Sequence, residues 1–241
     1  GIVAMQGGLA DNAIPREAEA TLVVAEEDKD KLDSIVKKVE QELQGELASK
    51  DAGVFIQAAY ENVGSYEAVT AEDTKKAAAF LISLPGGVQG MSADLPGLVE
   101  TSLNLGVMSC KAGTLSAEFS VRSSVESAKY ALIDRLQGLT LLAGGTNRIT
   151  GDYPGWKYRK DSPLRDKMVR LYEKMYGVAP KVEAINAVLE CGILGSKIAD
   201  LDCVSMGPDM TAIHTTEETL NIPSTRRVWE YLVALLEEKE A

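Results

Sequence analysis

Residues 102–122 read Ser102-Leu103-Asn104-Leu105-Gly106-Val107-Met108-Ser109-Cys110-Lys111-Ala112-Gly113-Thr114-Leu115-Ser116-Ala117-Glu118-Phe119-Ser120-Val121-Arg122. Apolar and polar or small residues alternate on both sides of Lys111-Ala112-Gly113, as in two strands that each bury one face. The short break with glycine predicts a hairpin turn. Such strands, with helices interleaved along the chain, predict an α/β sandwich built on an antiparallel sheet. Helices should cover one face of that sheet and leave the other face free.

Two polar residues of the predicted hairpin should share the free face. If the turn centres near Ala112, Asn104 lies opposite Ser120 and diagonal to Arg122. Diagonal neighbours are about 7–8 Å apart, close enough for an amide and a guanidinium to hold one anionic group together. A solvated sheet face with an ordinary arginine explains the same pattern, so both interpretations stay open.

Further elements flank the hairpin. Periodicity and capping residues predict strands over residues 18–25 and 54–59 and helices over residues 32–43, 70–81 and 123–139. Thr70 is the expected N-cap of the second helix, which Pro85 and two glycines end. Residues 85–97 are rich in glycine and proline and form a connection longer than most, which favours a functional loop.

The sequence pattern changes after Asp152-Tyr153-Pro154-Gly155-Trp156, which places a domain boundary between residues 1–152 and residues 153–241. Ser162-Pro163 is typical of a helix start, and Ser224 is the expected cap of the last helix. The apolar runs 182–188 and 201–206 predict buried strands of a parallel sheet, whose ligands would gather at the strand ends. So few strands need partners from a chain segment not present in this sequence.

His214 is the only histidine in the 241 residues. It follows a Gly207-Pro208 turn and precedes Thr215-Thr216-Glu217-Glu218, a loop setting that favours a metal ligand over a packing residue. Zinc needs three or four protein ligands, and the sequence has neither a second histidine nor a CxxC motif. Either His214 is an ordinary loop histidine, or its partner ligands lie outside this sequence.

Composition limits the partners. A net charge of −11 argues against nucleic acids and anionic membranes, because both bind basic surfaces. The sequence has no apolar run of about eighteen residues for a membrane span and no signal-peptide pattern at its start. Three cysteines, an odd number without metal-ligand spacing, fit reduced thiols in a cytoplasmic protein: Cys110, Cys191 and Cys203. Small molecules, metals or another subunit are the expected partners.

Several motifs occur in one order along the chain. They are Asp11-Asn12-Ala13-Ile14-Pro15-Arg16-Glu17-Ala18, Pro96-Gly97-Leu98-Val99-Glu100-Thr101-Ser102-Leu103-Asn104-Leu105-Gly106, Gly151-Asp152-Tyr153-Pro154-Gly155-Trp156, Leu189-Glu190-Cys191-Gly192 and the segment from Gly207-Pro208 to Glu218. Together they resemble the aminoacyl-histidine dipeptidases, di-zinc metallopeptidases of the carnosinase and carboxypeptidase G group. The resemblance covers nearly the whole chain. It implies a lid or dimerisation domain over residues 1–152, its start missing, followed by the C-terminal part of an α/β catalytic domain.

The resemblance also implies an activity and a set of roles. The complete protein would hydrolyse dipeptides of the Xaa-His type with two divalent ions, zinc in the first place and cobalt or manganese as alternatives. His214 would be a zinc ligand, and four residues would contact the substrate: Asn104, Arg122, Glu190 and Gly192. The general base and the other ligands would lie in the missing N-terminal half, so the chain alone should be inactive and should form a homodimer through the lid. The family usually has histidine and glycine where Asn186 and Val188 stand, which bears on substrate preference.

Two alternatives remain open at this stage. The chain could be a binding or dimerisation module in which His214 is incidental, which metal content would decide. It could also belong to a related aminoacylase or tripeptidase, which a panel of N-acyl and peptide substrates would separate.

Overall fold

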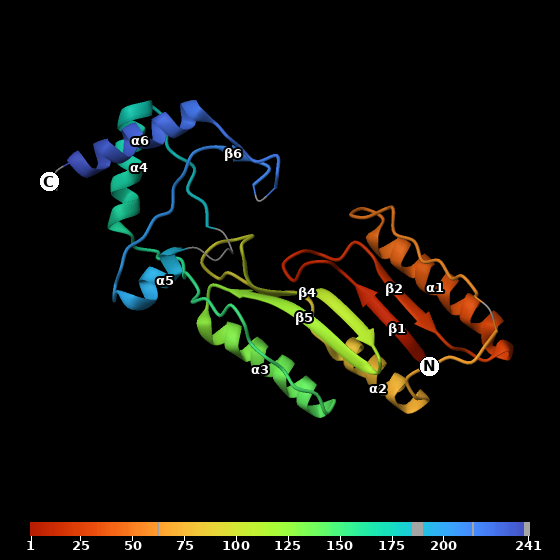
Figure 1. The fold of residues 1–241 in the computed structure, drawn as a ribbon. Coiled ribbons are helices and arrows are strands. Elements are labelled where there is room, and N and C mark those ends of the chain that lie inside the picture. The colour runs from red at the N-terminus through yellow and green to blue at the C-terminus, as the bar shows by residue number, and fades with distance from the viewer. Residues whose placement is uncertain (62, 185–189, 214, 239–241) are drawn as a thin grey trace. The chain divides into compact units, whose positions relative to one another are not determined.

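The computed structural model describes residues 1–61, 63–184, 190–213 and 215–238, which form a mixed α/β structure (Figure 1). Contacts divide the chain into two compact units. The first contains residues 1–85, 104–120 and 139–145, and the second contains residues 86–103, 121–138 and 146–241. The domain boundary after residue 152 stays a prediction.

A five-stranded sheet confirms the predicted antiparallel architecture. Its strands are β1 (Ile2–Gly7), β2 (Ala18–Leu22), β3 (Gly87–Met91), β4 (Val99–Lys111) and β5 (Thr114–Ser123). They follow the order β2-β1-β4-β3, and β5 also pairs with β4. The predicted hairpin joins β4 to β5 through Ala112 and Gly113, whose φ angles of 49° and 75° are those of a two-residue turn with both central residues left-handed.

Burial along β5 follows the predicted alternation, whereas burial along β4 does not. On β5, Leu115, Ala117 and Phe119 are half-buried, while the residues between Thr114 and Phe119 that separate them are exposed. On β4, Leu103 is only 3% exposed, but Asn104 and Gly106, which were expected on a free polar face, are half-buried and buried. The solvent-facing side expected for the hairpin is therefore found on β5 alone.

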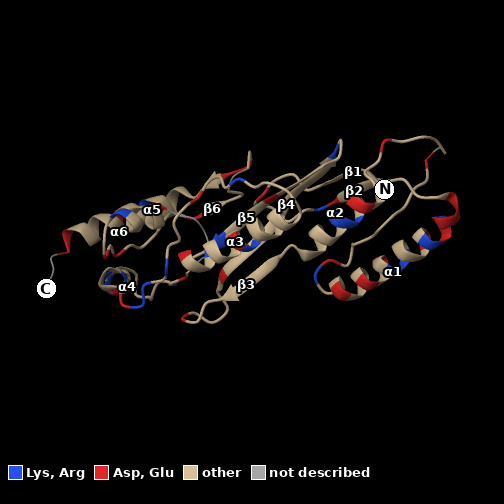
Figure 2. Cartoon of the chain, turned by 90° about the horizontal axis from the view of Figure 1, so that it is seen from below, with Lys and Arg blue, Asp and Glu red and all other residues tan. Residues whose placement is uncertain are grey.

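Two helices of the first unit lie close to their predicted positions. A short 3₁₀ turn, η1 (Glu26–Asp28), leads into α1 (Lys29–Leu47), and α2 spans Ala71–Ser83. Thr70 caps α2 as predicted, since its hydroxyl accepts a hydrogen bond from the backbone N–H of Asp73 at 3.1 Å. Basic and acidic side chains both line α1 (Figure 2), including the exposed Lys38–Glu42 pair. This mixture gives α1 no continuous basic face.

Residues 54–59 do not form the predicted strand. Side chains of α1 hold this segment instead: Glu40 accepts from the backbone N–H of Ile56 at 3.0 Å, and the side-chain amide of Gln44 donates to the carbonyl of Val54 at 3.1 Å. These backbone groups are satisfied by α1 side chains and not by a neighbouring strand, so the segment does not take part in the sheet.

The predicted loop 85–97 was wrong in its first half, where β3 pairs antiparallel with β4 from Gly87 to Met91. The ladder is irregular, with register shifts on both sides of Gly90. Glycine normally weakens strands, so the composition pointed to a loop. The hydrogen bonds that β4 supplies to this edge outweigh that preference.

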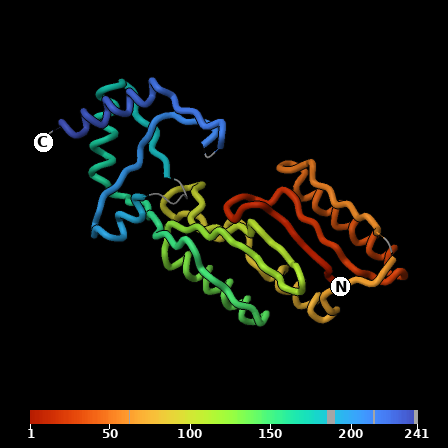
Figure 3. Tube along the Cα trace, viewed as in Figure 1, coloured from red at the N-terminus to blue at the C-terminus, as the bar shows by residue number. Residues whose placement is uncertain are grey.

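The second unit holds β3, the first part of β4, the end of β5 and a small apolar core between helices. Its further elements are α3 (Glu126–Leu142, whose last turn falls in the first unit), α4 (Pro163–Tyr176), α5 (Glu190–Lys197), β6 (Met210–Thr211), β7 (Thr219–Leu220) and α6 (Ile222–Glu237). Helix α6 crosses α4 (Figure 1 and Figure 3), and the two helices pack around Met168, Leu171 and Tyr231. The hydroxyl of Tyr231 donates to the carbonyl of Met168 at 2.6 Å, which ties the helices together.

The start of α4 confirms the prediction, whereas the cap of α6 does not. Ser162 accepts from the backbone N–H of Arg165, and Gly177 ends α4 in the left-handed conformation. The cap of α6 is Asn221, whose side-chain oxygen accepts from the backbone N–H of Ser224 at 2.8 Å. Ser224 was the wrong choice, because it lies three residues inside and its hydroxyl accepts from the N–H of Asp209.

The apolar runs expected to form a parallel sheet are not strands where the structure describes them. Residues 182–184 and 201–206 have no strand geometry, and residues 185–188 lie outside the described part. No strand of the described residues pairs with either run, and a strand without a partner leaves its backbone groups unpaired. None of the described helices has the length and apolar character that a membrane span requires.

Candidate functional site

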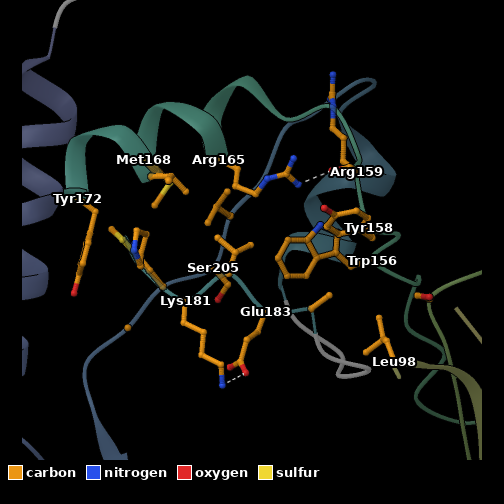
Figure 4. A pocket seen from close by; sticks show the side chains of 18 of the residues that line it. Leu98, Trp156, Tyr158, Arg159, Arg165, Met168, Tyr172, Lys181, Glu183 and Ser205 are labelled. Atoms are coloured by element: carbon orange, nitrogen blue, oxygen red, sulfur yellow. Dashed lines mark hydrogen bonds and ion pairs between the residues drawn. The ribbon is translucent and has the colours of Figure 1, made fainter. Parts of the chain in front are cut away.

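A pocket of about 680 Å³ opens in the second unit (Figure 4). It lies beside α4 and α6, and its wall also includes residues 98–100, 124–125, 156–159, 180–184 and 204–207. Aromatic, aliphatic and charged side chains line it together, among them Trp156, Tyr158, Arg165, Met168, Tyr172 and Lys181. Such a mixture suits a peptide-sized ligand or a packed segment of protein.

Arg165 is used to hold the chain that leads into α4. Its guanidinium donates to the carbonyl of Arg159 at 2.8 Å and to that of Lys160 at 2.5 Å. It also lies over the ring of Tyr158, 5.3 Å from the ring centre. With 18% of its side chain exposed, Arg165 has little capacity left for an external anion.

Asp202 ties the run 201–206 to the start of α4. Its carboxylate accepts from the hydroxyl of Ser162 at 2.7 Å and from the backbone N–H of Leu164 at 3.0 Å. Partial burial raises the pKa of Asp202, but these hydrogen bonds and the neighbouring arginines outweigh it and lower the pKa overall. The ionised carboxylate is therefore stabilised at a helix N-terminus.

The two predicted hairpin residues differ in their surroundings. The side-chain amide of Asn104 donates to the carbonyls of Asp11 and Ala13, at 3.2 and 2.7 Å. Arg122 is exposed on β5, and no hydrogen bond or ion pair joins it to another described residue. Asn104 falls in the first unit and Arg122 in the second, so their joint grip on one anion stays a prediction.

Glu190 and Gly192 lie in the first turn of α5, beside the turn that contains Trp156. Glu190 is exposed and Gly192 is buried. A Cβ atom on Gly192 would lie 2.7 Å from the carbonyl oxygen of Pro154, closer than any side chain tolerates. Only glycine lets α5 approach this turn, while the substrate role of both residues stays a prediction.

Three residues from the sequence analysis lie outside the described part of the chain: His214, Asn186 and Val188. Within residues 1–61, 63–184, 190–213 and 215–238, no three histidine, cysteine, aspartate or glutamate side chains group as metal ligands. Burial and the neighbouring Cys203 raise the pKa of Cys191, which favours the protonated thiol over the thiolate.

Similarity to known proteins now complements this geometry. No family model matches the sequence. The chain is 33% identical over 238 residues to the cytosol non-specific dipeptidase of Escherichia coli (strain K12), an alignment that covers 98% of the chain and 49% of that protein. The crystal structure of aminoacylhistidine dipeptidase from Vibrio alginolyticus superposes with a TM-score of 0.87 and 33% identity, over 100% of this chain and 49% of that one.

By sequence and by fold, this chain is similar to these two dipeptidases. It spans about half the length of the two dipeptidases that it matches. The resemblance drawn from its motifs is therefore confirmed, and so is the α/β fold class with an antiparallel sheet.

The sequence analysis missed one cluster of polar side chains in this chain. The ammonium of Lys129 on α3 lies 2.6 Å from Oδ1 of Asp152 and donates to the carbonyl of Tyr153 at 2.7 Å. The hydroxyl of Tyr130 donates to Oδ2 of Asp152 at 2.5 Å. A signal existed, because Lys129 precedes Leu132 by three residues and so falls on the apolar stripe of its helix. A lysine on such a stripe needs a partner, which the sequence does not identify.

Proposed function

We propose that the complete protein is a metal-dependent peptidase that hydrolyses dipeptides, with the Xaa-His type as its preferred class. The similarity to two dipeptidases over at least 98% of the chain supports this proposal most directly. Because the chain covers 49% of each relative, the remaining catalytic groups are expected in the part that it does not match. On this proposal the chain alone is inactive.

Two divalent ions belong to the proposal, zinc in the first place and cobalt or manganese as alternatives. When bound, such ions activate water and polarise the scissile carbonyl. His214 is the ligand that this chain would contribute. The described residues do not supply a ligand set by themselves, so the other ligands and the general base would come from the unmatched half of the protein.

The residues of this chain would bind and orient the substrate. Arg122 is exposed and has no ion-pair partner among the described residues. Its guanidinium can therefore donate hydrogen bonds to a carboxylate or a developing oxyanion. Asn104 can contribute only its side-chain oxygen while both amide hydrogens are donated to the carbonyls of Asp11 and Ala13. Glu190 would line the substrate-binding region, and Gly192 would keep α5 close to its turn.

The two relatives are named for different substrate ranges, so the substrate range of the complete protein has to be measured. One is a non-specific dipeptidase and the other an aminoacylhistidine dipeptidase. A panel of Xaa-His dipeptides, other dipeptides, tripeptides and N-acyl amino acids would separate these activities from those of an aminoacylase or tripeptidase. We also place the protein in the cytosol as a homodimer formed through the lid domain, residues 1–152. Sedimentation showing only monomer at micromolar concentration would contradict the dimer.

The deciding experiment measures hydrolysis of Xaa-His dipeptides by the complete protein, with zinc and after chelation, beside this chain under the same conditions. We expect activity in the complete protein only, and its loss on chelation. His214→Ala should lower both metal content and activity, by more than the roughly 10–100-fold that loss of an outer-shell partner costs. Thr216→Ala, in the same loop, is the control and should change neither. A folded dimer without activity in either form would favour a binding or dimerisation module.

A further inference from the structure

The Lys129 cluster connects α3 to a turn that has no regular secondary structure. Residues 152–156, called the Pro154 turn below, follow a left-handed glycine and form neither helix nor strand. Both carboxylate oxygens of Asp152 are used, one by the ammonium of Lys129 and the other by the hydroxyl of Tyr130. The side chain of Lys129 is 7% exposed and that of Asp152 is 39% exposed. The lysine is therefore the buried partner, and it depends on the turn for its counter-charge.

The Pro154 turn also packs by backbone on the start of α3. A Cβ atom at Gly155 would lie 2.8 Å from the carbonyl oxygen of Ser123 and 2.9 Å from that of Ser124. These are contacts that only glycine permits. The ion pair at one end of the turn and the close contact at Gly155 together fix its position against α3.

Helix α5 rests on the other side of the same turn. The absent Cβ of Gly192 would lie 2.7 Å from the carbonyl oxygen of Pro154 and 3.5 Å from Cβ of Trp156. Glu190 lies two residues before this contact, in the same helical turn. Trp156 itself lines the pocket (Figure 4). A displacement of the Pro154 turn would therefore move a pocket wall and the start of α5 together.

We propose that Lys129, Tyr130 and Asp152 are positioning residues for substrate binding: they hold the Pro154 turn, and through it they set the positions of Trp156, which lines the pocket, and of Glu190 at the start of α5. This inference rests on the proposed function. None of the three residues needs to touch substrate. Their role is to keep a binding wall in place, so that their loss weakens substrate binding more than it slows the chemical step.

The test uses Lys129→Met, which keeps the apolar stem and removes the ammonium, while the half-exposed Asp152 can be solvated. In the complete protein, KM for a dipeptide should rise about 10-fold or more while kcat changes by less than about 3-fold. Tyr130→Phe removes one hydrogen bond and should raise KM by only about 2-fold. Lys76→Met is the matched control, since Lys76 forms exposed pairs with Glu72 and Asp73 on α2, and it should change neither constant.

A second measurement does not need activity. Hydrogen exchange of the 241-residue chain should show faster exchange of the α5 amides in Lys129→Met, with α4 as the internal reference and Lys76→Met unchanged. If Lys129→Met loses protection in α4 as well, it has unfolded the unit, and Tyr130→Phe then carries the comparison. Unchanged α5 exchange with α3 intact, or a fall in kcat at constant KM, would overturn the inference. A complete protein without dipeptidase activity would defeat the proposed function, and the exchange result would still decide whether these residues hold α5.

Discussion

The β4–β5 hairpin and the segment from residue 157 to residue 207 are held together in different ways. In the hairpin, two strands joined by Ala112 and Gly113 satisfy each other's backbone groups. In the second segment, the extended stretches are held by side chains: Arg165 binds the carbonyls before α4, and Asp202 binds the helix start.

The difference shows which substitutions each region tolerates. The hydrogen bonds of a strand ladder join backbone atoms, so most side-chain substitutions leave them in place. The ladder is destabilised where a new Cβ atom would overlap neighbouring backbone atoms. A segment held by side chains depends on individual groups and on the apolar core next to it. Substitutions of the same chemical kind should therefore have different effects in the two regions.

The largest effect is expected in the core between α4 and α6. Leu171 is 5% exposed and packs with Met168 and Tyr231, so Leu171→Ala should lower the free energy of unfolding of the second unit by about 3 kcal/mol. Trp229→Ala on α6 is the control, because this side chain is 65% exposed and its loss should cost less than about 0.5 kcal/mol. Urea unfolding followed by circular dichroism measures both. Equal costs would mean that α4 and α6 do not share a core.

The next effect concerns space around the ladder. A Cβ atom at Gly106 on β4 would lie 2.3 Å from the carbonyl oxygen of Asp11 and 2.4 Å from that of Ala10. Because backbone atoms cannot rotate away, Gly106→Ala should destabilise the first unit by about 2 kcal/mol. It should also release the loop that Asn104 holds through the same stretch of chain. Proteolysis at residues 9–16 that stays as slow as in the wild type would contradict this.

Much of the fold could be predicted because helices and hairpins form from neighbouring residues. Thr70 and Ser162 cap their helices as expected, and the turn at Ala112 lies between its own two strands. Two of the failures share one cause, which is that the surroundings of a segment are not specified by its own pattern. Residues 54–59 meet side chains of α1, and residues 201–206 meet no strand among the described residues. Apolar periodicity reveals that a segment is buried, but it does not reveal what buries it.

The candidate site follows the same rule. The motif Leu189-Glu190-Cys191-Gly192 identifies Gly192 in the sequence. The motif does not explain why glycine is needed there, which is the close approach of the Pro154 carbonyl, 38 residues earlier in the chain. The pairing of Lys129 with Asp152 spans 23 residues, so the local pattern indicates that Lys129 needs a partner but does not identify it. Roles that depend on the family, such as that of His214, came from motif order and not from any spacing.

A smaller effect of opposite sign is expected at Gly45 on α1. No atom lies within 4 Å of the position that its Cβ would occupy, and the residue is inside a helix. Gly45→Ala should therefore stabilise the first unit by about 0.5–1 kcal/mol, the reverse of Gly106→Ala. Thermal unfolding of the two variants side by side tests whether space around the Cβ decides the sign. A loss of stability in Gly45→Ala would mean that α1 packs more closely than its exposed surface indicates.

The smallest effect is expected in the ionisation of Tyr60, which belongs to the segment 54–60 that side chains hold in the first unit. The hydroxyl of Tyr60 donates to the carboxylate of Asp33 at 2.5 Å, and this hydrogen bond, followed by burial and nearby acidic charge, raises the pKa of Tyr60 from 10.0 to about 12. Since the folded pKa lies above the unfolded one, the contribution to stability is complete below pH 10 and is lost as pH rises through about 12.

The absorbance difference between wild type and Tyr60→Phe isolates this ionisation, which should have its midpoint near pH 12. Asp33→Asn should return the midpoint toward 10, because it removes the accepting carboxylate while Lys29 stays over the ring at 4.3 Å. If the wild-type midpoint is already near 10, the Asp33 bond does not persist in solution. Residues 54–60 would then depend on Glu40 and Gln44 alone, and side-chain contacts would hold this segment less firmly than the ladder holds the hairpin.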